Sequence, residues 1–163
     1  MKIIHLIRHA KSSWDNPDLD DFSRTLNERG KKDAPFMANK LKDLGCNPDY
    51  FISSPAKRTK ETSKIFSQAL NFDFEKIIFD ERIYESSLKQ LLQILNEVPN
   101  NFNNIVLIGH NPTLTQLSNY LTNDFIDHIP TCGIVKIELE IDDWQHIIQG
   151  IGNKNFFIYP KMF

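Results

Sequence analysis

The sequence predicts an α/β fold with a mostly parallel central sheet. Short apolar segments, typical of buried strands, alternate along the chain with longer amphipathic segments that have helical periodicity. Several of the apolar segments are followed by a short polar loop and then by a helix-start signal. Strands and helices that alternate in this way indicate layers of helices packed on a sheet.

The N-terminal part of the chain predicts one strand and one helix, joined by a polar loop. Residues 2–8 are rich in Ile and Leu and are typical of a buried strand, and the loop Lys11–Ser23 is rich in aspartate. Thr25–Glu28 fits a capping box, so we expect a helix from there to about Leu44, where a glycine follows and suits a left-handed helix end. Pro35 lacks a backbone N–H and is expected to bend or shorten this helix.

The middle of the chain predicts two further strand and helix pairs. Tyr50–Ser53 is typical of a strand, and Ser54-Pro55 resembles an N-cap followed by proline at the first helical position. The helix that follows is expected over Ala56–Leu70, and a short strand over Lys76–Phe79. Ser87–Glu97 places its leucines on one face, which predicts an amphipathic helix.

The C-terminal part predicts a buried strand, a helix and a pair of strands. Ile105–Ile108 is fully apolar, and Pro112–Leu121 has the pattern of a helix. Ile134–Ile141 alternates as a strand does, and Gln145–Ile151 does so more weakly. We expect these last two strands to pair antiparallel at one side of the sheet, with the tail Phe156–Tyr159 packed on the body.

Composition limits the classes of protein to consider. A length of 163 residues predicts one domain, residues 1–163, and a net charge of −2 argues against a nucleic-acid or membrane-surface binder. Cys46 and Cys132 are too far apart in the sequence for a zinc ligand set, and as a single pair they make no disulfide framework. Because we find neither a signal peptide nor an apolar run of the roughly 20 residues that span a membrane, we expect a cytoplasmic protein.

Charged and titratable side chains follow three of the predicted strands. Arg8 and His9 end the first, Arg58 follows the Tyr50–Ser53 strand by one short loop, and His110 ends the apolar Ile105–Ile108 strand. If these strands are parallel neighbours, the three loops open on the same edge of the sheet, where ligand sites form in open α/β sheets. The helices that follow would add the positive ends of their dipoles, so the pattern predicts an anion site, most simply for phosphate.

Three motifs carry a resemblance to a known family. They are Arg8-His9-Ala10-Lys11-Ser12, Ser53-Ser54-Pro55-Ala56-Lys57-Arg58-Thr59-Lys60-Glu61-Thr62 and Gly109-His110-Asn111-Pro112, with Arg24-Thr25-Leu26-Asn27-Glu28-Arg29-Gly30 as a further similar segment. In order, spacing and setting they resemble the histidine phosphatase superfamily, which includes phosphoglycerate mutase. The short length and the form Arg8-His9-Ala10-Lys11-Ser12-Ser13-Trp14 look most like its small SixA-like phosphohistidine phosphatase branch. The resemblance implies a three-layer α/β/α, phosphoglycerate mutase-like fold.

The resemblance also implies a role for each motif residue. His9 would be the nucleophile that attacks phosphorus and becomes transiently phosphorylated. Arg8, Arg58 and His110 would hold the phosphoryl oxygens and stabilise charge in the transition state. Ser12 would add a hydroxyl contact to the phosphate.

The proton donor to the leaving group is assigned from a looser match. Asp80–Glu85 resembles the segment that carries the acidic residue in mutase relatives, and Glu81 is the candidate on that match. Glu85 and the aspartates of the Lys11–Ser23 loop stand behind it. Phosphohistidine has a good nitrogen leaving group, which needs less help from an acid than an alkoxide does.

The sequence therefore predicts a phosphatase that acts through phosphohistidine on His9, with no metal or organic cofactor. The expected partner is a phosphate-containing substrate, with a phosphohistidine protein as one candidate. The first alternative is a mutase or phosphomonoesterase on small metabolites, although little chain is available between Ile52 and Ile105 for the segments that enclose such substrates. The second is a non-catalytic phosphate-binding module. A kinase or ATPase is disfavoured because no glycine-rich nucleotide loop is present.

Overall fold

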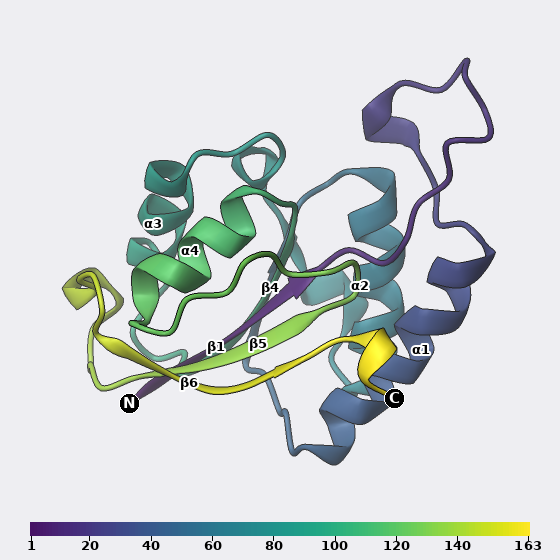
Figure 1. The fold of residues 1–163 in the computed structure, drawn as a ribbon. Coiled ribbons are helices and arrows are strands. Elements are labelled where there is room, and N and C mark those ends of the chain that lie inside the picture. Colours follow the sequence, from purple (N-terminus) through teal and green to yellow (C-terminus); the bar gives the residue numbers. More distant parts are fainter.

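The central sheet has six strands and is mostly parallel (Figure 1). The strands are β1 (Lys2–Arg8), β2 (Tyr50–Ser53), β3 (Ile78–Phe79), β4 (Asn104–Gly109), β5 (Ile134–Leu139) and β6 (Gly152–Ile158). In the computed structural model, which describes residues 1–163, their order is β3-β2-β4-β1-β5-β6. Strands β3, β2, β4 and β1 are parallel neighbours, whereas β5 is antiparallel to β1, and β6 is antiparallel to β5. The predicted α/β fold with a mostly parallel sheet is confirmed.

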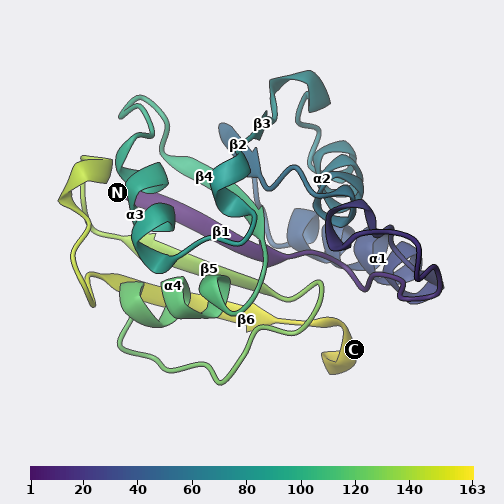
Figure 2. The ribbon, with the colours of Figure 1, turned by 90° about the horizontal axis from the view of Figure 1, so that it is seen from above.

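Two pairs of helices cover the two faces of this sheet, and Figure 2 shows the arrangement from above. The helices are α1 (Glu28–Asp43), α2 (Lys57–Ala69), α3 (Leu88–Asn96) and α4 (Thr113–Leu121). On one face, Met37 of α1 and Phe66 of α2 join the core that contains Ile7 of β1. On the other face, Leu91 of α3 packs in a second core with Ile4 of β1. Because successive strand residues point to opposite faces, β1 contributes to both cores of a three-layer structure.

None of the four helices combines the length and the apolar composition that a membrane span requires. Five short 3₁₀ segments lie in the connections between these elements or at the C-terminal end. They are η1 (Asp21–Ser23), η2 (Phe74–Lys76), η3 (Glu81–Ile83), η4 (Trp144–His146) and η5 (Pro160–Met162).

The start of α1 differs from the predicted capping box. Asn27, not Thr25, is the N-cap, and its side chain accepts a hydrogen bond from the Gly30 N–H at 2.9 Å. Thr25 is still in the preceding extended segment, where its carbonyl accepts a hydrogen bond from the Ser13 N–H. Pro35 lies inside α1 and does not end it. The side chain that caps a helix depends on the path of the chain before it, and here that path is fixed by pairing with the loop after β1.

Two strands also differ from their predicted bounds. The strand predicted at residues 76–79 is limited to Ile78–Phe79, because the residues before it form η2. The weak alternation at 145–151 predicts a strand that does not form, and the last strand is β6 instead. Trp144 explains this: its buried indole N–H donates to the carbonyl of Phe102 at 2.9 Å, which holds the segment in a turn. The C-terminal tail, predicted only to pack on the body, supplies the edge strand.

Gly30 allows the loop after β1 to lie directly against α1. A Cβ atom at residue 30 would overlap the backbone oxygen of Lys11, which also accepts a hydrogen bond from the Asn27 N–H. Backbone cannot move away as the end of a side chain can. The absence of a side chain at Gly30 therefore fixes the loop that follows β1 against the helix.

We predict that Gly30→Ala destabilises the fold, because the added methyl group overlaps the backbone of Lys11. The free energy of unfolding, measured with urea, should fall by about 1–3 kcal/mol, the usual range for overpacking. Lys32→Ala changes an exposed residue of the same helix and should stay within about 0.5 kcal/mol of the wild type. Equal stability of Gly30→Ala and the wild type would contradict this account of the loop.

Candidate active site

A polar pocket lies where β1, β2 and β4 end. These three strands are parallel, so their C-terminal ends meet at one edge of the sheet, as the sequence pattern predicts. Four of the residues that line it are arginine or lysine, two are histidine, and none is aspartate or glutamate. The ten residues are Arg8, His9, Lys11, Ser12, Trp14, Arg24, Arg58, His110, Asn111 and Thr131.

His9 is buried in this pocket, with 7% of its surface exposed. The carbonyl of Ala10 lies 2.8 Å from its Nδ1, so Nδ1 carries the proton and donates to that carbonyl. The other ring nitrogen, Nε2, then carries no proton, and its lone pair is directed toward Arg58. Burial, together with the nearby charges of Arg58 and Arg8, holds the pKa of His9 well below its usual value. His9 is therefore a neutral imidazole with a fixed tautomer, which is the form that acts as a nucleophile.

Arg58, in the first turn of α2, joins the groups of the pocket. Its Nε–H donates to Nε2 of His9 at 3.4 Å, and one Nη2–H is directed at Nδ1 of His110 at 3.3 Å. Its Nη1 and Nη2 groups also donate to the backbone oxygen and the carboxylate of Asp21 at 2.7 and 3.1 Å. Arg58 as a whole is only 6% exposed, and these contacts fix the orientation of its guanidinium.

His110 follows β4 and faces His9, with ring centroids 5.3 Å apart. Its Nε2 lies 2.8 Å from Oγ of Ser54, a buried residue that follows β2. Since Arg58 donates toward Nδ1, the proton of the neutral ring lies on Nε2 and is donated to Ser54. Burial, with the charge of Arg58 second, lowers the pKa of His110 to about 3.

Arg8 ends β1 and has unused hydrogen-bonding capacity. Its Nη1 donates to the carbonyl of Ile129 at 3.0 Å, but its Nε–H is buried without an acceptor. A buried donor without a partner costs about 1–3 kcal/mol. An anion in the pocket would supply the acceptor that Arg8 lacks.

The loop between β1 and α1 reaches the site through Asp21, which contacts Arg58 without lining the pocket. Besides Arg58, its carboxylate accepts hydrogen bonds from Tyr84 at 2.7 Å and from Arg24 at 2.9 Å. Burial raises the pKa of the Asp21 carboxyl, but the bond from Tyr84 and the charge of Arg58 outweigh it and lower the pKa to about 2. Asp21 is therefore a carboxylate at neutral pH and orients the arginines.

Ser12 and Arg24 belong to the same loop and line the pocket directly. Ser12 is buried, and its hydroxyl accepts a hydrogen bond from Arg24. The guanidinium of Arg24 in turn lies 3.2 Å from the centroid of the Trp14 ring, a favourable cation–π arrangement. Trp14 itself is 72% exposed, so it forms part of the rim of the pocket.

The structure brings most of the predicted site residues together but leaves the predicted acid apart. Arg8, His9, Ser12, Arg58 and His110 all line the pocket. Glu81 and Glu85 are exposed and line no part of it. Nor do any three His, Cys, Asp or Glu side chains gather in an arrangement that could hold a metal ion.

Several residues of the site were not predicted. Trp14 and Arg24 lie within segments that carry the family resemblance, so that signal could have found them. Asp21 was expected only as one of the loop aspartates behind Glu81 in the role of proton donor, and its place beside Arg58 was not predicted. The others are Lys11, Ser54, Tyr84, Asn111 and Thr131.

Comparison with known proteins identifies the family. The model of the histidine phosphatase superfamily (branch 1) matches residues 4–104, and the chain belongs to that superfamily. An uncharacterized chloroplastic protein of Arabidopsis thaliana is 29% identical over 148 residues, which are 86% of this chain and 67% of that protein. The mitochondrial serine/threonine-protein phosphatase Pgam5 of Drosophila sechellia is 37% identical over 75 residues, 46% of this chain. The matched part is only 25% of the length of Pgam5.

Solved structures of SixA proteins have the same fold. SixA of Agrobacterium tumefaciens is 25% identical, with a TM-score of 0.83 and 98% of each chain covered. The protein histidine phosphatase SixA in complex with tungstate is 20% identical, with a TM-score of 0.84 and again 98% of each chain covered. The three motifs indicated the histidine phosphatase superfamily, and this assignment is confirmed. The superfamily and its fold support phosphatase activity.

Three buried histidines predict a loss of stability in acid. Burial lowers the pKa of His5 to about 4 and that of His110 to about 3, and it holds that of His9 well below its usual value. Below a pH of about 6.5 the unfolded chain binds protons at these positions while the folded chain does not. The free energy of unfolding should therefore fall from pH 6.5 to pH 4, by up to about 1.4 kcal/mol per pH unit for each histidine.

The measurement is urea unfolding at several pH values. His5→Gln, which leaves the pocket intact, should reduce the slope by roughly a third, since it removes one of the three groups. Gln145→Ala changes an exposed residue without a titratable side chain and should keep the slope of the wild type. If His5→Gln leaves the slope unchanged, His5 does not contribute to the pH dependence of the free energy of unfolding, and the prediction is wrong.

Proposed function

We propose that this protein is a phosphatase that removes the phosphoryl group from phosphohistidine, through a covalent intermediate on His9. The observation that carries the proposal is the state of His9: a buried neutral ring, whose Nδ1–H donates to the carbonyl of Ala10 and whose unprotonated Nε2 accepts only a long hydrogen bond of 3.4 Å from Arg58. A nucleophile so placed, in a pocket lined by cationic groups and no carboxylate, suits attack on a phosphoryl group.

In the first step, Nε2 of His9 attacks phosphorus, and the bond between phosphorus and the leaving nitrogen breaks. The leaving imidazole keeps the electron pair and departs neutral if its other ring nitrogen carries a proton. Arg8 and Arg58 would bind the phosphoryl oxygens, because Arg8 has a buried N–H without an acceptor and Arg58 already points at the attacking atom. His110, whose ring lies 5.3 Å from that of His9, would add a third contact by turning its Nε2–H from Ser54 to a phosphoryl oxygen.

In the second step, water attacks phosphorus and the bond to Nε2 of His9 breaks. His9 keeps the electron pair and its Nδ1 proton and becomes neutral again. Inorganic phosphate leaves with the oxygen of the water, and the two protons of the water stay on the phosphate or pass to solvent. Asp21 would act here as a positioning residue, because its carboxylate and carbonyl oxygens hold the guanidinium of Arg58.

The choice of phosphohistidine rests on the leaving group. An alkoxide needs a proton donor, which is worth roughly 10²–10⁴-fold in rate. No aspartate or glutamate lines the pocket, and Asp21, the nearest carboxyl to Arg58, has its pKa lowered to about 2. A site with no such donor is suited to a nitrogen leaving group, and a phosphohistidine peptide or protein is therefore the proposed substrate.

We predict that His9→Ala loses turnover of a phosphohistidine peptide by roughly 10³-fold or more, as removal of a covalent nucleophile does. It should also abolish acid-labile phosphate bound to the enzyme after a rapid quench. His146→Ala, which changes an exposed histidine away from the pocket, is the control and should keep both. Full activity of His9→Ala would refute the mechanism.

The same assay separates the alternatives. Wild-type protein should hydrolyse the peptide faster than a phosphomonoester such as phenyl phosphate. The reverse order would favour a phosphomonoesterase or mutase-like enzyme. Phosphate binding without turnover of any substrate would favour a non-catalytic phosphate-binding module.

We predict that Glu81→Gln leaves the rate on both substrates unchanged within about 2-fold, because Glu81 is exposed and outside the pocket. The measurement is kcat/KM for the phosphohistidine peptide and for phenyl phosphate. A loss of about 10²-fold, confined to phenyl phosphate, would restore Glu81 as the proton donor.

A further inference from the structure

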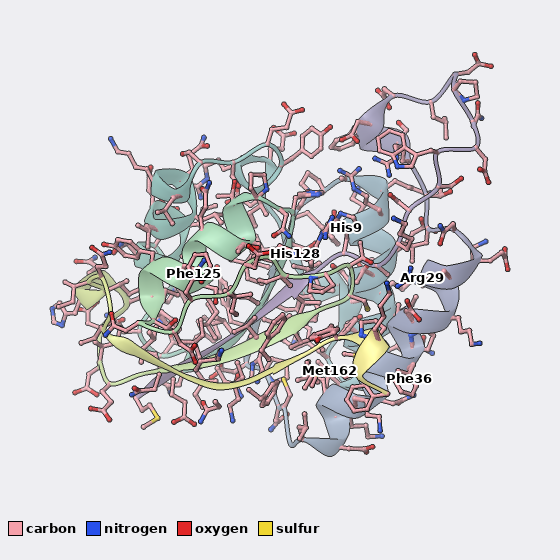
Figure 3. The ribbon with its side chains drawn as sticks, viewed as in Figure 1. His9, Arg29, Phe36, Phe125, His128 and Met162 are labelled. Carbon is pink, nitrogen blue, oxygen red and sulfur yellow. The ribbon has the colours of Figure 1, made fainter.

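A second recess lies beside the polar pocket that contains His9, which we call the phosphate pocket. The two have three lining residues in common. Arg8, Lys11 and Thr131 line both. The second recess continues past them to Arg29 of α1 and to Lys161, which belongs to η5 after β6. We call it the basic recess. Its remaining lining residues are His128, Pro130, Tyr159 and Pro160, and Figure 3 labels Arg29 and His128.

The charge of the basic recess differs from that of the protein as a whole. The chain has a net charge of −2, yet four of the nine lining residues are arginine or lysine and none is aspartate or glutamate. Of the four cations, Arg29 is partly neutralised, since Asp33 lies 3.3 Å from it. The ring of His128, which also lines the recess, lies 3.8 Å from Asp127. Arg8, Lys11 and Lys161 have no carboxylate partner within ion-pair distance. The recess therefore has cationic groups in excess.

Contacts of the C-terminal turn fix the far wall of the basic recess. The ring of Phe163 packs edge-on against Phe36 of α1 at 5.7 Å, and the Lys40 ammonium lies 4.7 Å from the same ring. These contacts hold η5 against α1, so the backbone that carries Lys161 has a defined position beside Arg29. A cationic wall on an anchored segment is better ordered than a free lysine tail.

We propose that the basic recess binds a second anionic group, a carboxylate or a phosphate, on the same substrate molecule whose phosphoryl group reacts at His9. The proposal rests on the proposed function, because it takes the neighbouring pocket as the place of the reacting group. The shared residues Arg8 and Lys11 make the two recesses continuous, so one molecule can fill both. For a phosphohistidine peptide, the second group would be an acidic side chain near the phosphohistidine.

The test is a double variant, Arg29→Gln with Lys161→Gln, which leaves every residue of the phosphate pocket in place. Two phosphohistidine peptides are compared, one with glutamate on both sides of the phosphohistidine and one with glutamine. The double variant should raise KM for the glutamate peptide by about 3- to 30-fold, as expected for two exposed ion pairs. The KM for the glutamine peptide and both kcat values should stay unchanged.

A second pair of probes identifies the source of the anion and does not depend on turnover. Phenyl phosphonate and carboxyphenyl phosphonate cannot be hydrolysed, and their dissociation constants are measured by calorimetry. If the substrate is a small molecule with two anionic groups, carboxyphenyl phosphonate should bind the wild type more tightly than phenyl phosphonate does. The double variant should bind the two phosphonates equally. An effect on the peptides alone assigns the recess to acidic protein substrates. Either result supports a second anion site.

The control and the contrary outcomes are distinct. Lys64→Gln with Lys89→Gln removes two exposed cations from α2 and α3 and should leave every constant unchanged. Equal changes for charged and uncharged probes, or no change for any of them, would overturn the basic recess as a specific site. Wild-type protein that binds both phosphonates but turns over no substrate would refute the proposed phosphatase and leave the binding comparison valid.

Discussion

The guanidinium of Arg58 contacts three segments that are far apart in the sequence. Its Nε meets His9 at the end of β1, its Nη2 meets His110 after β4, and both Nη groups meet Asp21 in the loop before α1. Each contact depends on the others, because a planar guanidinium has one orientation for all its N–H groups. The parallel order of β2, β4 and β1 makes this possible, since it brings the three strand ends to one edge.

The electrostatics of the site follow from the same arrangement. Burial lowers the pKa of both imidazoles and the charge of Arg58 adds to the effect, which keeps His9 able to attack and His110 able to donate from Nε2. Asp21 balances part of this charge without entering the pocket as an acid. Positive charge in the pocket and a neutral nucleophile beside it are the requirements of phosphoryl transfer: Arg58 supplies the charge, and burial does most to keep His9 neutral.

The sequence predicted what depends on local pattern. The apolar runs of β1 and β4, and the residues Arg8, His9 and His110 that end them, can be recognised because a buried strand must stop where polar side chains begin. Arg58 could be placed because a short loop separates it from β2. These features need no knowledge of tertiary contacts.

The parts that could not be predicted depend on long-range contacts. Asp21 reaches Arg58 and Tyr84 through a loop without periodicity, so nothing near it in the sequence specifies its position. Glu81 was predicted as the acid from a similar segment, but η3 is fixed by Arg82, which pairs with Asp80 and Glu97, and Glu81 is left facing solvent. The last strand lies later than its alternation indicates, because the side chain of Trp144 holds a turn before it.

The two tryptophans give the molecule an internal optical reporter. Trp144 is fully buried in the core under α3, whereas Trp14 is 72% exposed and stacked on Arg24 at the rim of the pocket. Their indole emissions should therefore differ in colour and in access to a dissolved quencher. An anion that draws Arg24 away from the Trp14 ring would alter only the redder, quenchable component, so ligand entry could be followed by light without any label.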